Sequence, residues 1–153
     1  MLVKERYLRV KEELLNDTSI NSKNRETIRE FLRLEEYKLK RKQGLSEVDE
    51  RSYKTLYFYI GRLKNLNIWF ENKDWGSLTE KEITNLIDDL EDGKIKTKKG
   101  TNYSDRSLYY QMLGGMLFEI IGKADISKKF TKKYSVKLHE ARPRGILRQN
   151  RTA

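Results

Sequence analysis

The sequence predicts an all-α fold, a compact bundle of four to five helices followed by a basic C-terminal tail. A single proline, Pro143, and only nine glycines in 153 residues suit long helices better than a turn-rich β fold. Apolar residues recur at three- and four-residue steps over most of the chain before the tail, as on helices with one buried face. Aromatic residues make up 10% of the chain, so a core can be buried and a fully disordered chain is excluded.

The first three helices are predicted from apolar spacing and from the residues at their ends. Residues 1–15 form a short helix candidate that ends at a polar segment. A second helix runs from about Ser22 to Gln43, with Gly44 as its stop. A third begins between Ser46 and Ser52 and ends near Phe70.

Two further helices follow, separated by a lysine-rich loop. The segment Thr79-Glu-Lys-Glu82 is a capping box, which predicts a helix over about 80–92. Residues 94–102 are a polar loop, and Ser104 can cap a fifth helix that extends to about Ile121. The apolar pattern thins from residue 123 onward, as in a linker or disordered tail.

The positive charge is unevenly distributed. The formal net charge is +10, of which +8 falls in residues 123–153 and +2 in residues 1–122. Before the tail, residues 94–110 hold five bases and one acid, whereas residues 71–92 hold two bases and eight acids. An excess of positive charge points to a polyanionic partner, nucleic acid first and anionic membrane second.

Several function classes have little support. Without cysteine there is no disulfide, no thiolate metal site and no cysteine nucleophile. The apolar runs are too short for a membrane span and the start lacks the apolar block of a signal peptide, so we expect a cytoplasmic, nucleoid-associated protein with no membrane partner. No carboxylate pair, phosphate loop or metal-ligand spacing suggests an enzyme, and we expect no catalytic residue, metal or cofactor.

Two of the predicted helices have a polar face beside their apolar one. On a helical wheel, one side of the third helix is basic and hydroxylated. On the fifth helix, short polar groups lie near the N-terminus, where free N–H groups favour phosphate. The residues of these faces and of the loop that precedes the fifth helix are Arg51, Lys54, Thr55, Phe58 and Arg62; Ser107, Tyr110, Gln111 and Gly114; and Lys94, Lys96, Lys98 and Lys99.

Each of these features also has a purely structural interpretation. Exposed Lys and Arg opposite an apolar stripe usually form a solvated face, and Tyr110 and Phe58 are aromatic residues that often pack in a bundle. Gly114-Gly115 is a common helix-packing contact, and the lysine loop can be merely flexible. The coincidence of two similar helices with a basic loop favours a functional interpretation.

Three segments in order resemble the N-terminal core-binding domain of tyrosine recombinases, the phage and archaeal integrases. They are Ser52-x-x-Thr55 followed by Leu63, Leu66 and Trp69; Leu78-Thr-Glu-Lys-Glu-Ile83; and Ser104-Asp-Arg-Ser107 through Phe118. The resemblance covers about residues 21–123, which leaves 1–20 as an N-terminal extension and 124–153 as a basic interdomain linker or tail. Ser107 stands where the family usually has Thr, and Gly115 where a larger apolar residue is common.

The resemblance implies a SAM-like bundle that forms one jaw of a clamp around duplex DNA, with possible self-association on the DNA. In the family a separate C-terminal domain supplies a tyrosine nucleophile and an Arg, His and Lys constellation. No segment of this sequence matches that domain, and His139 and Tyr134 both lie in the basic tail. We therefore expect no catalysis by this chain. Expected phosphate contacts are Arg51, Lys54, Arg62, Lys94, Lys96, Lys98, Lys99 and Arg106, and expected groove-facing residues are Thr55, Ser107, Tyr110 and Gln111.

Two alternatives to a recombinase domain remain. One is a helical protein-interaction module, in which the acidic segment 80–92 docks a basic partner. The other is a DNA-binding regulator unrelated to recombination. A helix-turn-helix regulator would need a tight three- to four-residue turn, and the connections over 72–79 and 92–103 are too long for one.

Overall fold

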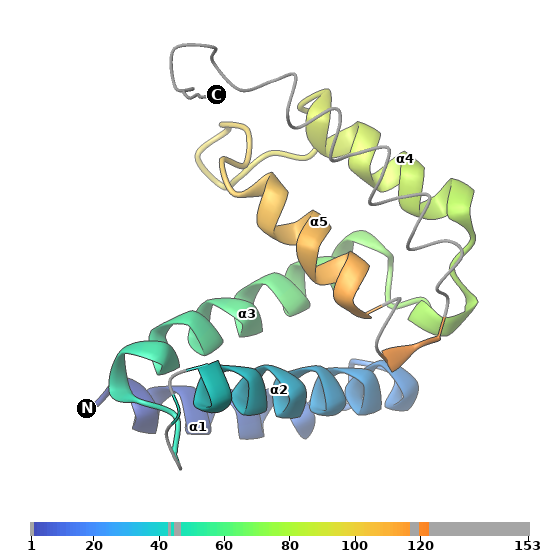
Figure 1. Cartoon of the computed structure of the whole chain (residues 1–153). Helices are drawn as coiled ribbons and strands as arrows, with labels where there is room; N and C mark the ends of the chain where they lie inside the picture. The colour runs from blue at the N-terminus through green and yellow to red at the C-terminus, as the bar shows by residue number, and fades with distance from the viewer. Residues whose placement is uncertain (1, 43, 45–46, 117–119, 123–153) are drawn as a thin grey trace, which may run out of the picture. The chain divides into compact units, whose positions relative to one another are not determined.

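The computed structural model describes residues 2–42, 44, 47–116 and 120–122 (Figure 1). Within these ranges the fold is all-α and contains no strand, so the predicted fold class is confirmed. The chain divides into two compact units, Met1–Thr79 and a second that begins at Glu80. The predicted tail over 124–153, with His139 and Tyr134, lies outside the described residues.

Unit 1 contains three α-helices and one 3₁₀ turn. They are α1 (Val3–Leu15), α2 (Ser22–Lys42), α3 (Glu50–Trp69) and η1 (Trp75–Ser77). Helix α1 packs against both α2 and α3, so it belongs to the same compact unit as the helices that follow. The core of the unit is built from one side of each helix and comprises Tyr7, Leu14, Ile28, Leu32, Leu56, Leu63, Leu66 and Trp75.

A buried tyrosine joins α1 to α2. The hydroxyl of Tyr7, a residue with no exposed surface, donates to Glu36 Oε2 at 2.5 Å, and Lys11 Nζ donates to the same oxygen at 2.7 Å. Burial, the hydrogen bond to Glu36 and the negative charge of Glu36 raise the pKa of Tyr7 above its ordinary value near 10. The ionised phenolate is therefore incompatible with this packing.

Tyr7→Phe is expected to lower the free energy of unfolding by about 1.5 kcal/mol near neutral pH, because a hydrogen bond to a charged group is lost. Above about pH 10 the unfolded state releases the Tyr7 proton while the folded state retains it, so this part of the stability falls as the pH rises. The variant lacks that part and should show a shallower alkaline decline in urea midpoints. The exposed Tyr37→Phe serves as the control, and an unchanged alkaline slope in Tyr7→Phe would contradict the assignment.

Helix α3 begins at an aspartate. Asp49 is the N-cap, and its side chain accepts the backbone N–H of Ser52 at 2.7 Å. The start falls inside the predicted window of 46–52. Ser52, the first residue of the motif Ser52-x-x-Thr55, is a buried residue of the first turn. Asp49 is a favourable N-cap because its carboxylate accepts a free backbone N–H and its negative charge interacts favourably with the helix dipole at the N-terminus.

Unit 2 contains α4 (Glu80–Glu91) and α5 (Arg106–Gly115) in its described part. Helix α4 starts directly after Thr79, as the capping box predicts, and it contacts α5. Helix α5 starts later than predicted, because Asp105 and not Ser104 is its N-cap. Its predicted continuation to Ile121 passes through residues 117–119, which lie outside the described residues. The buried residues of the two helices are Ile83, Leu86, Ile87, Leu90, Tyr109, Tyr110, Met112 and Leu113.

Candidate nucleic-acid interface

One face of α3 is exposed along most of its length and carries the predicted basic residues. We call Arg51, Lys54, Thr55, Phe58 and Arg62 the α3 stripe. The first three are exposed, Phe58 is 49% exposed and Arg62 is half-buried. Leu56, Ile60 and Leu63 are buried on the other side of the helix, so the predicted division of α3 into two faces is confirmed. The stripe presents cations, a hydroxyl and an aromatic ring to solvent.

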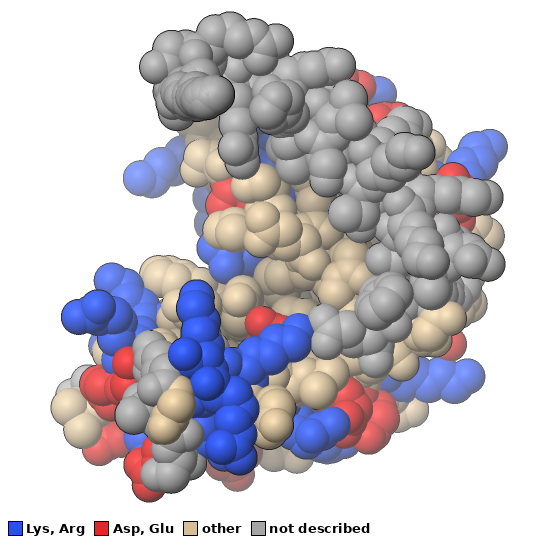
Figure 2. Space-filling model, in the orientation of Figure 1, with Lys and Arg blue, Asp and Glu red and all other residues tan. Residues whose placement is uncertain are grey.

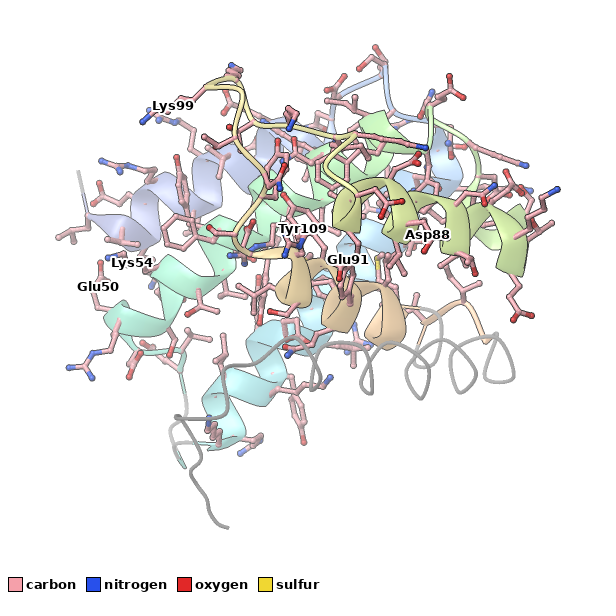
Figure 3. All side chains as sticks on the ribbon, turned by 90° about the horizontal axis from the view of Figure 1, so that it is seen from above. Glu50, Lys54, Asp88, Glu91, Lys99 and Tyr109 are labelled. Carbon is pink, nitrogen blue, oxygen red and sulfur yellow. The ribbon has the colours of Figure 1, made fainter. Side chains whose placement is uncertain are left out.

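The N-terminal end of the stripe has mixed charge. Glu50 is exposed and lies one helical turn before Lys54; both are labelled in Figure 3. The Glu50 carboxylate accepts the backbone N–H of Lys4 at 3.3 Å. This acid reduces the positive potential next to Lys54, and the three cations Arg51, Lys54 and Arg62 leave the stripe with a net positive charge.

Further basic residues that the sequence analysis did not select lie at the end of α2. Lys40, Arg41 and Lys42 form its last turn, and Arg41 lies 5.4 Å from the centroid of the Tyr37 ring. Figure 2 shows Lys and Arg side chains gathered in unit 1 where α2 ends and α3 begins. The run Lys-Leu-Lys-Arg-Lys at 38–42 was the available signal. Cations at a helix C-terminus also complement the helix dipole, so part of their role is structural.

The predicted lysine loop of unit 2 has a defined backbone. We call residues 96–102 the lysine hairpin, because Lys96 and Asn102 form an antiparallel bridge. The backbone N–H of Thr97 donates to the Thr101 carbonyl at 2.8 Å, and that of Gly100 donates to the Thr97 carbonyl at 2.9 Å. The side chains of Lys98 and Lys99 are exposed at its tip. A three-residue hairpin loop of this kind holds its tip in one backbone conformation.

The base of the hairpin is joined to the end of α4. The backbone N–H groups of Lys94 and Ile95 both donate to the Asp89 carbonyl, at 2.9 and 3.3 Å. Gly93 has a φ of +73°, and a Cβ there would lie 2.7 Å from Asn102 Oδ1. Gly93 therefore allows both the left-handed turn and the close approach of Asn102.

Glu91 engages two of the predicted site residues inside unit 2. Its Oε2 accepts from Arg106 Nε at 2.8 Å and from the Tyr110 hydroxyl at 2.8 Å. Arg106 Nη1 also donates to the Tyr103 carbonyl at 3.0 Å. Figure 3 shows Glu91 on α4 facing α5. This cluster, which we call the Glu91 junction, ties the two helices together on either side of the lysine hairpin.

The junction corrects the expectation for Tyr110 and gives Arg106 a partner that the sequence analysis did not predict. Tyr110 was expected to face a groove, but it is 4% exposed and its hydroxyl is bonded to Glu91. Arg106 was expected to contact phosphate, but its guanidinium already meets a carboxylate and a carbonyl. The helical wheel assigned Tyr110 to the polar face of its helix but did not identify Glu91, which lies on another helix, as a partner of Tyr110 or of Arg106.

The remaining α5 residues keep part of the predicted arrangement. Gln111 is exposed and Ser107 is half-buried one turn before it. The helix N-terminus does not have the predicted neutral cap, since the N-cap is Asp105 and its side chain makes no capping hydrogen bond. An acid at this position disfavours phosphate at the free N–H groups.

Neither a metal-ligand group nor a membrane-spanning helix is found in the part of the chain that the structure describes. Among them there is no group of three or more His, Asp or Glu side chains placed to hold a metal ion. In the same ranges, no helix has the length and apolar character needed to cross a membrane. The candidate residues form two separate sets, the α3 stripe in unit 1 and the lysine hairpin with Ser107 and Gln111 in unit 2.

Comparison with family models, curated proteins and solved structures finds no match to this chain. The likeness to the core-binding domain of tyrosine recombinases thus stays a prediction from sequence motifs.

Proposed function

We propose that this chain binds duplex DNA without catalysing a reaction on it, as the N-terminal DNA-binding half of a site-specific tyrosine recombinase. The α3 stripe is the observation that supports DNA binding most directly. It places Arg51 and Lys54 on the same exposed helix face as the hydroxyl of Thr55. Cations hold the phosphate backbone, and short polar side chains beside them reach base edges.

The recombination context rests on the order of three sequence motifs, not on the site. The segments Ser52–Trp69, Leu78–Ile83 and Ser104–Phe118 follow the order of the core-binding domain that they resemble. In that family strand cleavage belongs to a separate domain, so the proposed role of this chain is to grip DNA and position a partner domain on it. Self-association on DNA is compatible with that role.

The proposed DNA-binding residues fall into two groups, cations that contribute affinity and polar side chains that can contribute sequence preference. Lys54, Arg51 and Arg62 contribute through phosphate contacts, which carry no sequence information. Thr55 and Gln111 are the exposed side chains suited to base edges, since a glutamine amide can pair with the N6 and N7 positions of adenine. Tyr110 and Arg106 are not part of this set, because both bind Glu91.

Lys54→Ala is expected to weaken DNA binding and to reduce the slope of log affinity against log salt by about 0.9, the value for one lost phosphate contact. The measurement is fluorescence anisotropy with a labelled duplex between about 50 and 200 mM salt. Lys64→Ala is the matched control, because Lys64 is an exposed lysine of the same helix that lies off the stripe. Its slope should stay that of the wild type.

Two results would contradict the proposed function. One is an affinity that does not change with salt, and the other is an equal loss in Lys54→Ala and Lys64→Ala.

The competing role is a protein-interaction module, and the exposed apolar side chains of Phe58 and Ile68 on α3 support it. Failure to bind DNA, together with a protein partner that stays bound after nuclease treatment, would favour that role.

A further inference from the structure

We infer that the lysine hairpin is a preformed phosphate-binding element in which Gly100 is the positioning residue. The inference rests on the proposed DNA-binding function and goes beyond it, because it assigns affinity to a fixed backbone turn and not only to the number of lysines. A flexible loop with the same lysines would bind as a set of unordered charges. A fixed turn presents Lys98 and Lys99 together to the DNA backbone.

The backbone of the tip depends on Gly100. Its φ is +81°, in the left-handed region that residues other than Gly and Asn rarely adopt. Its N–H donates to the Thr97 carbonyl at 2.9 Å, which closes the turn. A Cβ at this position would meet no atom within 4 Å, so the backbone conformation and not packing is what requires glycine here.

Side-chain contacts between the two arms of the hairpin support the same turn. The hydroxyls of Thr97 and Thr101 lie 2.8 Å apart, and Lys96 Nζ donates to Asn102 Oδ1 at 3.2 Å. All of these groups are exposed or half-buried, so the hairpin is held by its own hydrogen bonds and not by burial in the core. Such bonds order the tip before any ligand binds and reduce the entropy lost on binding.

The charge distribution of unit 2 favours a phosphate ligand at the hairpin. Residues 80–122 contain six bases and eight acids, and four of the six bases are the lysines at 94, 96, 98 and 99. An otherwise acidic segment is therefore basic at its hairpin. Lysine binds phosphate as a point charge and lacks the planar fork with which arginine reads guanine. The hairpin should hold the DNA backbone with little regard to sequence.

The test compares variants that separate charge from backbone. Changing Lys98 and Lys99 together to Ala should reduce the slope of log affinity against log salt by about 1.8. The loss of affinity should be the same factor on a duplex of preferred sequence and on a duplex of unrelated sequence. Gly100→Pro keeps every charge but fixes φ near −65° and removes the N–H that closes the turn. It should weaken binding about tenfold, as ordering of the two lysines is lost.

Two further variants act as controls on the backbone. Gly100→Asn tolerates the left-handed conformation and should bind within about twofold of the wild type. Changing Thr97 and Thr101 together to Val removes the hydroxyl contact while it keeps the shape and charge, and should weaken binding by about threefold. Circular dichroism is the check that each variant retains its helices.

The outcomes distinguish this inference from the proposed function. If the wild type does not bind DNA, the proposed function fails. If the wild type binds and the lysine variant loses affinity, while Gly100→Pro and the threonine variant bind like the wild type, the lysines act as unordered charges and the inference is overturned. A tenfold loss in Gly100→Pro with recovery in Gly100→Asn supports it. Unequal losses on the two duplexes in the lysine variant would show that the tip reads sequence, which also contradicts it.

Discussion

Asn24→Ala is expected to lower the free energy of unfolding of unit 1 by about 3 kcal/mol, because the substitution leaves buried hydrogen-bonding groups without partners. Asn24 has no exposed surface. Its Oδ1 accepts the backbone N–H of Trp75 at 2.9 Å, and its Nδ2 donates to Asn67 Oδ1 at 2.8 Å and to the Lys73 carbonyl at 2.9 Å. Alanine replaces none of these bonds and leaves the Trp75 N–H, Asn67 Oδ1 and the Lys73 carbonyl without this partner.

The effect is large because Asn24 joins three elements at one point. The start of α2, the end of α3 and η1 meet around its side chain. In the turn that follows α3, Glu71 and Asn72 have φ values of 56° and 58°, a conformation that costs free energy for residues other than glycine. Asn72 is held there by Asn21, whose backbone N–H and Nδ2 donate to Asn72 Oδ1 and to its carbonyl at 3.0 and 2.8 Å. Loss of Asn24 weakens the support for this strained turn.

Tryptophan fluorescence measures this prediction selectively. The two tryptophans of the chain, Trp69 and Trp75, both lie in unit 1, so a urea titration followed by their emission reports the unfolding of that unit. Lys64→Ala, at an exposed position of α3 in the same unit, is the control and should change stability by less than about 0.5 kcal/mol. An Asn24→Ala midpoint equal to that of the wild type would show that the network contributes nothing.

The helices were predictable from sequence, while the connections between them were not. The apolar spacing of α2, α3 and α4 and the Thr79 capping box located these elements, because a helix with one buried face has apolar residues at regular three- and four-residue steps in its sequence. The 3₁₀ turn at Trp75–Ser77 was missed. Asp74 caps this turn locally by accepting the Gly76 N–H, a short Asp-Trp-Gly-Ser signal that the sequence analysis did not use. The turn is also held by the bond from the Trp75 N–H to Asn24, a contact between distant residues that leaves no local pattern.

The same limit applies to the candidate site. The exposed residues of the α3 stripe were predictable, because a residue opposite a buried stripe on a long helix faces solvent. The burial of Tyr110 and the ion pair of Arg106 were not predicted, because both depend on a carboxylate from another helix. The lysine hairpin was expected only as a loop. Its turn depends on φ > 0 at Gly100, for which a lone glycine among lysines is a weak signal.

Glu91→Ala is expected to lower the stability of unit 2 by about 2 kcal/mol, since two hydrogen bonds to a charged acceptor are lost. Glu91 is the shared acceptor of Arg106 Nε and the Tyr110 hydroxyl, and its side chain is only 13% exposed. Tyr110 is buried and would be left without this partner, whereas the guanidinium of Arg106 can be partly rehydrated. Amide hydrogen exchange along α4 and α5 measures the loss, which should be largest for residues near the junction.

DNA binding by Glu91→Ala then tests whether the junction positions the lysine hairpin. Asp92→Ala is the matched control, because it removes the same charge from an exposed neighbour of Glu91. By electrostatics alone, both substitutions raise affinity for DNA, and Glu91→Ala would raise it more if the released Arg106 bound phosphate. If the junction holds the hairpin in place, Asp92→Ala tightens binding slightly while Glu91→Ala weakens it. Equal gains in the two variants would show that charge near the hairpin matters and its attachment to α4 and α5 does not.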